Sequence, residues 1–264
     1  MPVSLAELTD QCIDFISAEY PVSATALGLH SRDGSLGSFS REAHEARRDR
    51  TEGILSDLEK LSTSDMSADD LIDRQVLMLN LRSSIFSHDV LRSHERNPAD
   101  YVGAGLYGCN QLLLRDFAPL EERARCFASR LRDVPQVLAD ARANVTEPPR
   151  AFASVAASLA KGGVSFLETT VPSLSAELPG LAGELESAAG PAKAAFAETA
   201  EHFERAAAAS DEPFHIGRDA YEWLLTERHL LDLTSGDLLA IGERAISETT
   251  AQMERAAREI DARR

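Results

Sequence analysis

The stretch 103–108 reads Gly-Ala-Gly-Leu-Tyr-Gly and has the G-x-G-x-x-G spacing of dinucleotide-binding loops. In such loops the glycines let the backbone approach a pyrophosphate at a helix N-terminus, directly after a hydrophobic strand. The preceding residues, 93–100, are almost all polar or charged and cannot form that strand. We therefore expect these glycines to serve close helix packing or a flexible segment, with a cofactor loop as the less favoured alternative.

Two His-Glu pairs, at 44–45 and 94–95, each begin like the zinc-binding pattern H-E-x-x-H. That pattern needs a second histidine one helical turn later, so that both imidazoles share one face. The second histidine would fall at positions 48 and 98, which are Arg48 and Pro98, so neither pair completes the pattern. Both pairs are predicted to be solvated helix residues.

His229 and Asp232 are three residues apart and could share a metal, but they lack a third ligand, so a surface pair is favoured. The segment 33–37, Asp-Gly-Ser-Leu-Gly, has aspartate in place of the first glycine of a G-x-S-x-G nucleophile turn. The sequence therefore predicts no catalytic residue and no metal site in this chain.

Charged residues cluster between positions 115 and 133, where Arg115, Asp116, Arg123, Arg130 and Arg132 occur. Most are predicted to form exposed ion pairs, each contributing about 0–1 kcal/mol. The alternative is a cationic wall that holds a substrate carboxylate, because a guanidinium offers a bidentate fork of donors. Spacing alone favours the solvated helix surface.

The 264 residues include 43 acidic and 27 basic ones, which gives a formal net charge of -16. A surface this acidic repels phosphate, so neither nucleic acid nor a membrane is predicted as a partner. The three cysteines form no C-x-x-C pair and are predicted to be small buried residues. Residues 1–20 lack the basic start and apolar run of a signal peptide, so a cytoplasmic location is expected by default.

Helical periodicity dominates, and the predicted fold class is all-α, a multi-helix array or bundle of long amphipathic helices. Ser4, Ser40, Ser67 and Thr234 have the type and spacing of helix N-caps. The helix after Ser67 is predicted to continue to about Asn97, because Pro98 disfavours helix in the residue before it. Its expected core face consists of Ile72, Val76, Leu79, Phe86 and Val90.

Glycine and proline mark the expected breaks. Residues 31–39 are predicted to be a loop, and the prolines at 148–149 to end a helix. Helices within 162–190 are expected to be short, before an Ala-rich helix that starts at Pro191. The last helix has no stop signal, so residues 1–264 are predicted to be one helical domain or lobe, truncated at its C-terminal end, with a sub-boundary near 146–150.

Four stretches, in this order along the chain, resemble the bacterial domain-of-unknown-function family 885 (DUF885). The first stretch, 20–30, begins with Tyr-Pro and ends with Leu-Gly-Leu-His. The second consists of Asn-Pro-Ala-Asp-Tyr at 97–101, followed by Leu-Leu-Leu-Arg-Asp-Phe-Ala-Pro at 112–119. Two further stretches follow at 130–149 and 216–243. The resemblance runs along nearly the whole chain.

The resemblance implies an all-helical zinc metallopeptidase of the gluzincin type, in which this chain corresponds to the N-terminal half. The family's metal motif, a His-Glu pair with a further His and a distal Glu, belongs to the C-terminal half. Nothing in residues 1–264 matches it, so no catalytic residue is carried over and no cofactor is expected in this chain. Zinc is implied for the full-length family.

By this resemblance the chain is the N-terminal helical lobe of a substrate cleft and is inactive by itself. Arg115, Asp116 and Tyr101 are its candidate substrate-binding residues. The expected partners are the C-terminal half of the same protein or a second copy, with a peptide as substrate. The alternative is a complete, non-enzymatic helical scaffold that binds a partner through its Ala-rich segment, 192–209, and its last helix.

Overall fold

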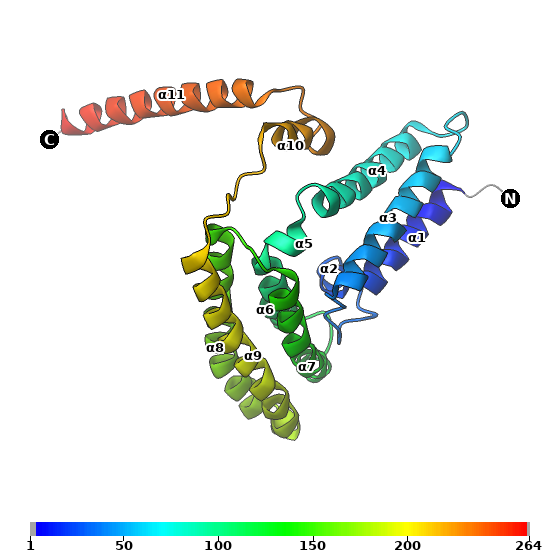
Figure 1. Cartoon of the computed structure of the whole chain (residues 1–264), viewed down its shortest axis with the longest axis vertical. Coiled ribbons are helices and arrows are strands. Elements are labelled where there is room, and N and C mark those ends of the chain that lie inside the picture. Colours follow the sequence, from blue (N-terminus) through cyan, green and yellow to red (C-terminus); the bar gives the residue numbers. More distant parts are fainter. Residues whose placement is uncertain (1–3, 263–264) are drawn as a thin grey trace. The chain divides into compact units, whose positions relative to one another are not determined.

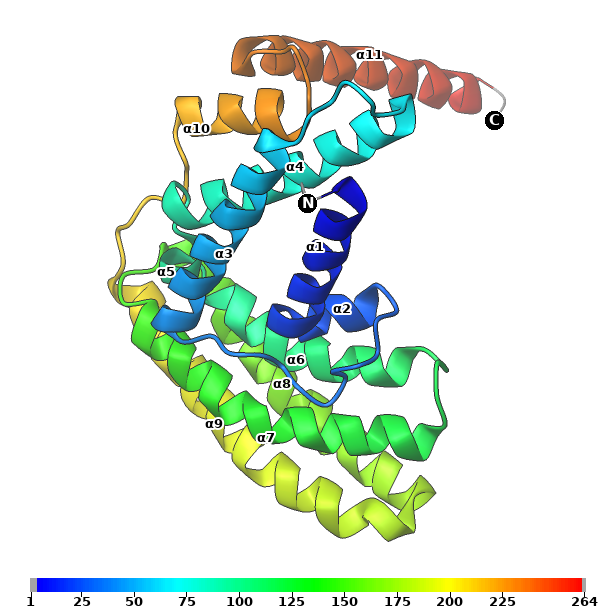
Figure 2. The same ribbon diagram turned by 90° about the vertical axis from the view of Figure 1, so that its right-hand side faces the viewer.

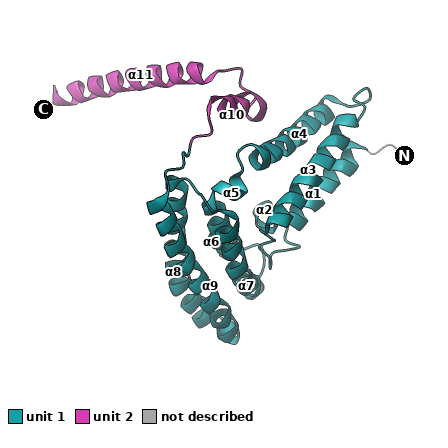
Figure 3. Ribbon diagram, in the orientation of Figure 1, with its two compact units in different colours: residues 1–214 teal, residues 215–264 magenta. Residues whose placement is uncertain are grey.

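The computed structural model describes residues 4–262, which are mostly helical and contain no strand, so the all-α prediction is confirmed. The chain divides into two compact units, residues 1–214 and 215–264 (Figure 3). No helix in the described part of the chain has the length and apolar character needed to cross a membrane.

The helices of unit 1 are α1 (Leu5–Glu19), α2 (Pro21–Ala26), α3 (Arg41–Lys60), α4 (Ala68–Asp89), α5 (Ser93–Arg96), α6 (Pro98–Leu114), α7 (Leu120–Asn144), α8 (Arg150–Glu177), the short 3-10 turn η1 (Pro179–Leu181) and α9 (Ala182–Ala209) (Figure 1). Unit 2 contains α10 (Arg218–Trp223), the π-helical turn η2 (Leu224–Arg228) and α11 (Ser235–Asp261).

The predicted N-caps are confirmed. The side chains of Ser4, Ser67 and Thr234 each accept a hydrogen bond from the backbone N–H three residues later, and the carboxylate at that later position accepts from the cap's own N–H. Ser40 caps α3 through its side-chain oxygen alone. A cap of this kind contributes about 1 kcal/mol, because it satisfies N–H groups that lack a partner within the helix.

Unit 1 contains two separate hydrophobic clusters. The larger fills the space between α6, α7, α8 and α9, where α8 packs along α9, α6 packs along α7, and the two pairs touch through α6–α8 and α7–α9 contacts (Figure 2). The smaller joins α1, α3 and α4 and consists of Leu8, Cys12, Ile54, Leu55, Leu58, Met78 and Leu81. The helix α2 and the loop 31–39 lie between them, and Leu36 of that loop belongs to the larger cluster.

For α4 the predicted end is wrong, and so is most of the predicted core face. The helix ends at Asp89, because the N–H groups of Val90 and Leu91 both bond to the Phe86 carbonyl and Arg92 adopts a left-handed conformation with φ 49°. No glycine lies at this helix end, so the sequence contains no signal for it. Of the expected residues, Ile72, Val76 and Val90 are exposed, whereas Phe86 is buried as predicted. The helix also buries Met78 and Leu81, which belong to the cluster with α1 and α3.

The expectation of short helices within 162–190 is also wrong, since α8 and α9 are 28 residues long each and are separated only by η1. Pro172 and Pro191 lie inside these helices. An internal proline costs about 3 kcal/mol or more, but most helix stability in proteins comes from packing an apolar face. Both helices bury long rows of alanine and leucine, which outweigh the prolines.

Two glycines of the stretch 103–108 lie inside α6 at helix contacts, which confirms the close-packing interpretation. A Cβ added at Gly108 would lie 2.8 Å from the Val22 side chain and 2.9 Å from that of Leu36. A Cβ added at Gly105 would lie 3.4 Å from the Phe196 ring. The cofactor-loop alternative fails because these residues are helical and no strand precedes them among the described residues.

Gly162 and Gly163 offer a matched test of this packing, because they are neighbours on α8. A Cβ at Gly163 would lie 2.8 Å from the buried Phe196 ring, whereas one at Gly162 meets nothing within 4 Å. Gly163→Ala is expected to lower the free energy of unfolding by about 1–3 kcal/mol through overpacking. Gly162→Ala should raise it by about 0.5–1 kcal/mol through helix propensity. Urea denaturation measures both, and equal effects would contradict the packing.

Candidate functional site

A hollow of about 520 Å³ lies in unit 1, where α3, α4, α5 and α6 meet the end of α1 and the start of α2. Polar and aromatic side chains from these separate elements form its walls, among them Tyr20, His44, Arg47, His88, His94 and Tyr101. A second hollow of about 370 Å³ lies between α1 and α3 and shares Glu19 and Arg47 with the first.

Three imidazole rings form one wall of the larger hollow. The rings of His88 and His94 stack with centroids 4.2 Å apart, and the His44 ring lies 5.0 Å from that of His94. The His94 side chain is only 10% exposed. The prediction of solvated His-Glu pairs is therefore wrong for both histidines, because the turn at 90–92 folds α5 back toward α3.

Two of these imidazoles, His44 and His94, are poorly placed to carry charge. Burial is the main cause that lowers the pKa of His44 from its ordinary 6.5 to about 3, and the nearby Arg47, His94 and His88 lower it further. Burial and the His88 ring also lower the pKa of His94. His44 is therefore neutral at pH 7 and presents one donor and one acceptor nitrogen to its surroundings.

These three histidines do not fit a zinc site. Zinc needs nitrogens that converge on one point from different directions, but the His88 and His94 rings lie face to face at an interplanar angle of 12°. His88 Nδ1 is already 2.8 Å from Asp89 Oδ1. Within residues 4–262 no group of three or more His, Cys, Asp or Glu side chains is arranged to hold a metal ion.

Tyr101 lies in this hollow and is 1% exposed. Its hydroxyl donates to the His94 carbonyl, accepts from Asn144 Nδ2 at 3.2 Å and lies 3.3 Å from His44 Nε2. Burial raises its pKa to about 12, so the phenol stays protonated. The hydroxyl thus joins α3, α5, α6 and α7 at the floor of the hollow.

The structure does not bring the three predicted substrate-binding residues together. Tyr101 lies in the first turn of α6, whereas Arg115 and Asp116 follow its last turn, about 20 Å away along the helix. Both are exposed and lie outside the two hollows. Asp116 pairs with Arg123 Nη2 at 2.6 Å, which gives it a structural partner.

Arg123 and Arg130 are 5% and 0% exposed, so the prediction of solvated ion pairs is wrong for them. Arg123 donates to the carbonyls of Ala118 and Leu112 at 2.9 and 3.1 Å and closes the turn between α6 and α7. Arg132, in contrast, is half-exposed and pairs with Glu184 at 2.7 Å, as an exposed ion pair should.

The buried Arg130 fixes the short segment that borders the hollow. Its guanidinium donates to the Gly108 carbonyl of α6 and, at 2.6 Å, to Thr25 Oγ1 of α2. Thr25 in turn donates to Asp33 of the following loop at 2.6 Å. One side chain of α7 thereby holds α2 and the loop 31–39 in place. No local pattern indicated this role, because buried and exposed arginines have the same spacing on a helix.

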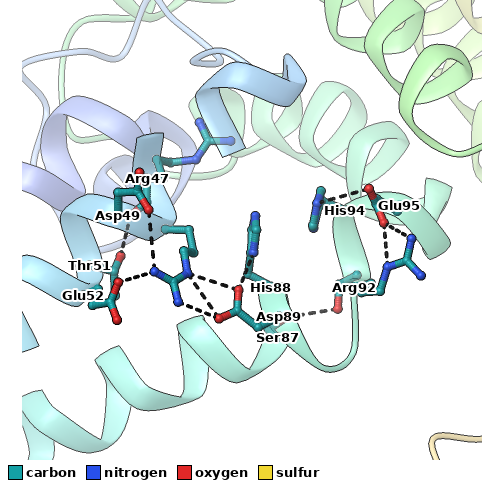
Figure 4. A network of polar contacts seen from close by, with 12 residues as sticks. Arg47, Asp49, Thr51, Glu52, Ser87, His88, Asp89, Arg92, His94 and Glu95 are labelled. Carbon is teal, nitrogen blue, oxygen red and sulfur yellow. Dashed lines mark hydrogen bonds and ion pairs between the residues drawn. The ribbon is translucent and has the colours of Figure 1, made fainter. Parts of the chain in front are cut away.

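Arg47 and Arg48, which are adjacent on α3, have different surroundings (Figure 4). Arg48 forms ion pairs with Asp49, Glu52 and Asp89, and the Nη2–Oδ2 distance to Asp89 is 2.8 Å. The Arg47 side chain points away from this network and donates to the Ser38 carbonyl at 2.6 Å.

The sequence indicated Tyr101 but missed the three histidines and Arg47 as residues of one site. The His44–Tyr101 contact spans 57 residues, and no local pattern connects these positions.

The helical layer of α6–α9 with α1–α5 packed beside it defines an all-α fold of a known kind. A solved structure from Shewanella oneidensis, described as a "putative lipoprotein of unknown function", shares it with a TM-score of 0.82 over 95% of this chain. The two sequences are 19% identical, so the likeness shows the fold alone, and this chain spans 47% of that one.

The sequence profile of the family described as "Bacterial protein of unknown function (DUF885)" matches residues 21–264, and the chain belongs to this family. No curated protein matches the sequence. The expected cytoplasmic location is contradicted, because the structural neighbour is described as a lipoprotein. The expectation had rested on a missing signal at residues 1–20, which is no positive sign of any compartment.

The low pKa of His44 predicts a pH dependence of stability. The unfolded chain binds a proton on His44 below pH 6.5, whereas the folded chain does so only near pH 3. The free energy of unfolding should therefore fall as the pH is lowered from 6.5 toward 3, by less than about 1 kcal/mol per pH unit for this partly exposed group. His44→Gln should flatten that slope in urea titrations at several pH values. Identical slopes for both proteins would contradict the buried neutral imidazole.

Proposed function

We propose that the chain is a substrate-binding lobe of a peptidase-like DUF885 protein, and that its larger hollow receives part of a peptide. The hollow carries the proposal, because it combines aromatic, imidazole and hydroxyl groups within one concave site of about 520 Å³. Sites of this size and mixed lining are typical of small-molecule and peptide binding. The 47% coverage of the structural neighbour supports a role as one part of a longer architecture.

The polar groups of the lining hold the walls of the hollow in place. His44 and Tyr101 contact each other, and they also contact Arg47, Asn144 and the His94 carbonyl. The walls are therefore suited to enclose a peptide, and hydrolysis would require groups outside this lobe, with zinc supplied by the other half of the protein. The description of the neighbour as a lipoprotein supports a location in the cell envelope.

The alternative is a non-enzymatic scaffold, and one feature of unit 2 favours it. The helix α11 exposes an apolar row at heptad spacing, in which Leu239, Ile246, Met253 and Ile260 are 64%, 69%, 68% and 59% exposed. Such a row is typical of a helix that packs against a partner. The inward alanines of the segment 192–209 are already buried within unit 1, so α11 would be the interface.

Filling the hollow tests the proposal. Ala104 lines it from α6 and is half-buried, so Ala104→Phe places a ring in the empty space. We expect hydrolysis of short peptides by the protein of the complete reading frame to lose about tenfold or more in kcat/KM, equivalent to about 1.4 kcal/mol or more. The midpoint of thermal unfolding should change little. Val155→Phe, at an exposed position of α8, is the matched control.

Full activity of Ala104→Phe would exclude the hollow from the substrate path. The reading frame itself decides between the two functions. A frame that continues past Arg264 into a His-Glu…His helix supports the peptidase lobe, and a stop codon at that point favours the scaffold.

A further inference from the structure

Arg47 is a buried cation with an incomplete set of partners. It is 6% exposed and lies on α3 between the two hollows, both of which it lines. Its Nη1 donates to the Ser38 carbonyl at 2.6 Å, and its Nη2 lies 3.1 Å from His44 Nδ1. A guanidinium has five N–H donors and stays charged at any pH of interest. The Tyr20 side chain is a third neutral partner of the guanidinium. None of these groups carries a counter-charge for Arg47.

No carboxylate of the described residues forms an ion pair with Arg47, although the chain carries 43 acidic residues. The adjacent Arg48 forms three ion pairs and is more exposed. Buried charges in proteins are ordinarily paired, because removal from water is costly without a counter-charge. An unpaired guanidinium that lines two hollows thus has the properties of an anion-binding group.

The surroundings of Arg47 select the kind of anion. Its Cζ atom lies 5.4 Å from the centroid of the Tyr20 ring, and Phe39 and Tyr101 form further walls of the larger hollow. The flat guanidinium fork matches a carboxylate, and aromatic walls match an apolar or aromatic group. A carboxylate carried next to such a group would satisfy both at once.

We propose that Arg47 binds the carboxylate of a short peptide, and that the neighbouring aromatic or apolar side chain of this peptide occupies the larger hollow. The peptide as ligand rests on the proposed function, whereas the carboxylate follows from Arg47 itself. The carboxylate-binding role expected of the 115–132 arginines thereby passes to a residue of α3.

Two carboxylates of the larger hollow, Glu19 and Asp100, oppose the ligand. Asp100 accepts a hydrogen bond from Asn97, whereas Glu19 lines both hollows together with Arg47 and would repel an anion that approaches it. Removing this charge by Glu19→Gln should therefore strengthen the binding of a carboxylate and leave an uncharged ligand unaffected. Substitution of Arg47 should have the opposite effect on the charged ligand.

The experiment compares three probes on the whole 264-residue chain by isothermal titration calorimetry at pH 7. N-acetyl-Ala-Phe carries a terminal carboxylate, N-acetyl-Ala-Phe amide is its uncharged match, and N-acetyl-Asp-Phe amide carries the carboxylate on a side chain. We expect a carboxylate probe to bind about 10- to 100-fold more tightly than the amide, as a charge-assisted bidentate contact implies. The acid that binds more tightly shows whether Arg47 prefers a terminal carboxylate or a side-chain carboxylate.

Variants assign this preference to Arg47. Arg47→Met should abolish the discrimination between acid and amide, and Arg47→Lys should retain only part of it, because lysine lacks the planar fork. Arg205→Met, at an exposed position of α9, removes the same charge far along the chain and should leave the discrimination unchanged. If Arg47→Met fails to fold, the wild-type probes together with Arg47→Lys and Glu19→Gln decide the question.

Equal affinity for acids and amide, absence of binding at millimolar concentrations, or full discrimination in a folded Arg47→Met would each overturn the proposal. The outcome is independent of hydrolysis. An acid preference without peptidase activity in the complete protein would keep the subsite and reject the proposed function. Peptidase activity without an acid preference would keep the proposed function and reject the carboxylate subsite at Arg47.

Discussion

A guanidinium that leaves water needs acceptors within the protein, and three buried arginines of unit 1 meet this need to different extents. Arg123 is satisfied by two carbonyls and Asp116, and it closes the turn between α6 and α7. Arg130 is fully buried and ties α2 and its loop to the α6–α7 pair. Arg47 contacts neutral partners, which are the Ser38 carbonyl, His44 and the Tyr20 side chain. Removing one partner of a buried charge is far more costly than the net stability of the pair, so these contacts fix the local geometry more than they stabilise the fold.

The hollow is a consequence of this arrangement. Two distinct hydrophobic clusters, one within α6–α9 and one within α1, α3 and α4, lie on either side of the polar residues that line the hollow. Apolar clusters close-pack wherever side chains interdigitate, but hydroxyls, imidazoles and guanidinium groups must keep hydrogen-bonding geometry and leave space between them. Tyr101 illustrates this, because its hydroxyl holds contacts to α3, α5 and α7 at once. This polar lining therefore combines rigid donors with open volume, which is the usual property of a binding site.

Local chemistry was predictable from the sequence, and long-range placement was not. The caps at Ser4, Ser40, Ser67 and Thr234 and the break at 148–149 follow from side-chain hydrogen bonding and proline sterics within a few residues. The end of α4 was missed because Arg92 adopts a left-handed conformation without a glycine. The length of α8 and α9 was missed because burial outweighs Pro172 and Pro191, and burial is not visible in a local pattern. Of the site, Tyr101 was indicated, while His44 and Arg47 are joined to it only by tertiary contacts.

The measurement that most directly tests whether Arg47 is a buried cation open to a ligand is nitrogen-15 NMR of arginine side chains during titration with N-acetyl-Ala-Phe. The account predicts that the Nε–H signal of Arg47, assigned by its loss in Arg47→Lys, shifts with the acid and stays fixed with the amide. It also predicts that the signals of Arg123 and Arg130 do not move, because neither side chain lines the two hollows. An Arg47 signal that is unchanged by the acid, or that moves equally with the amide, would contradict it.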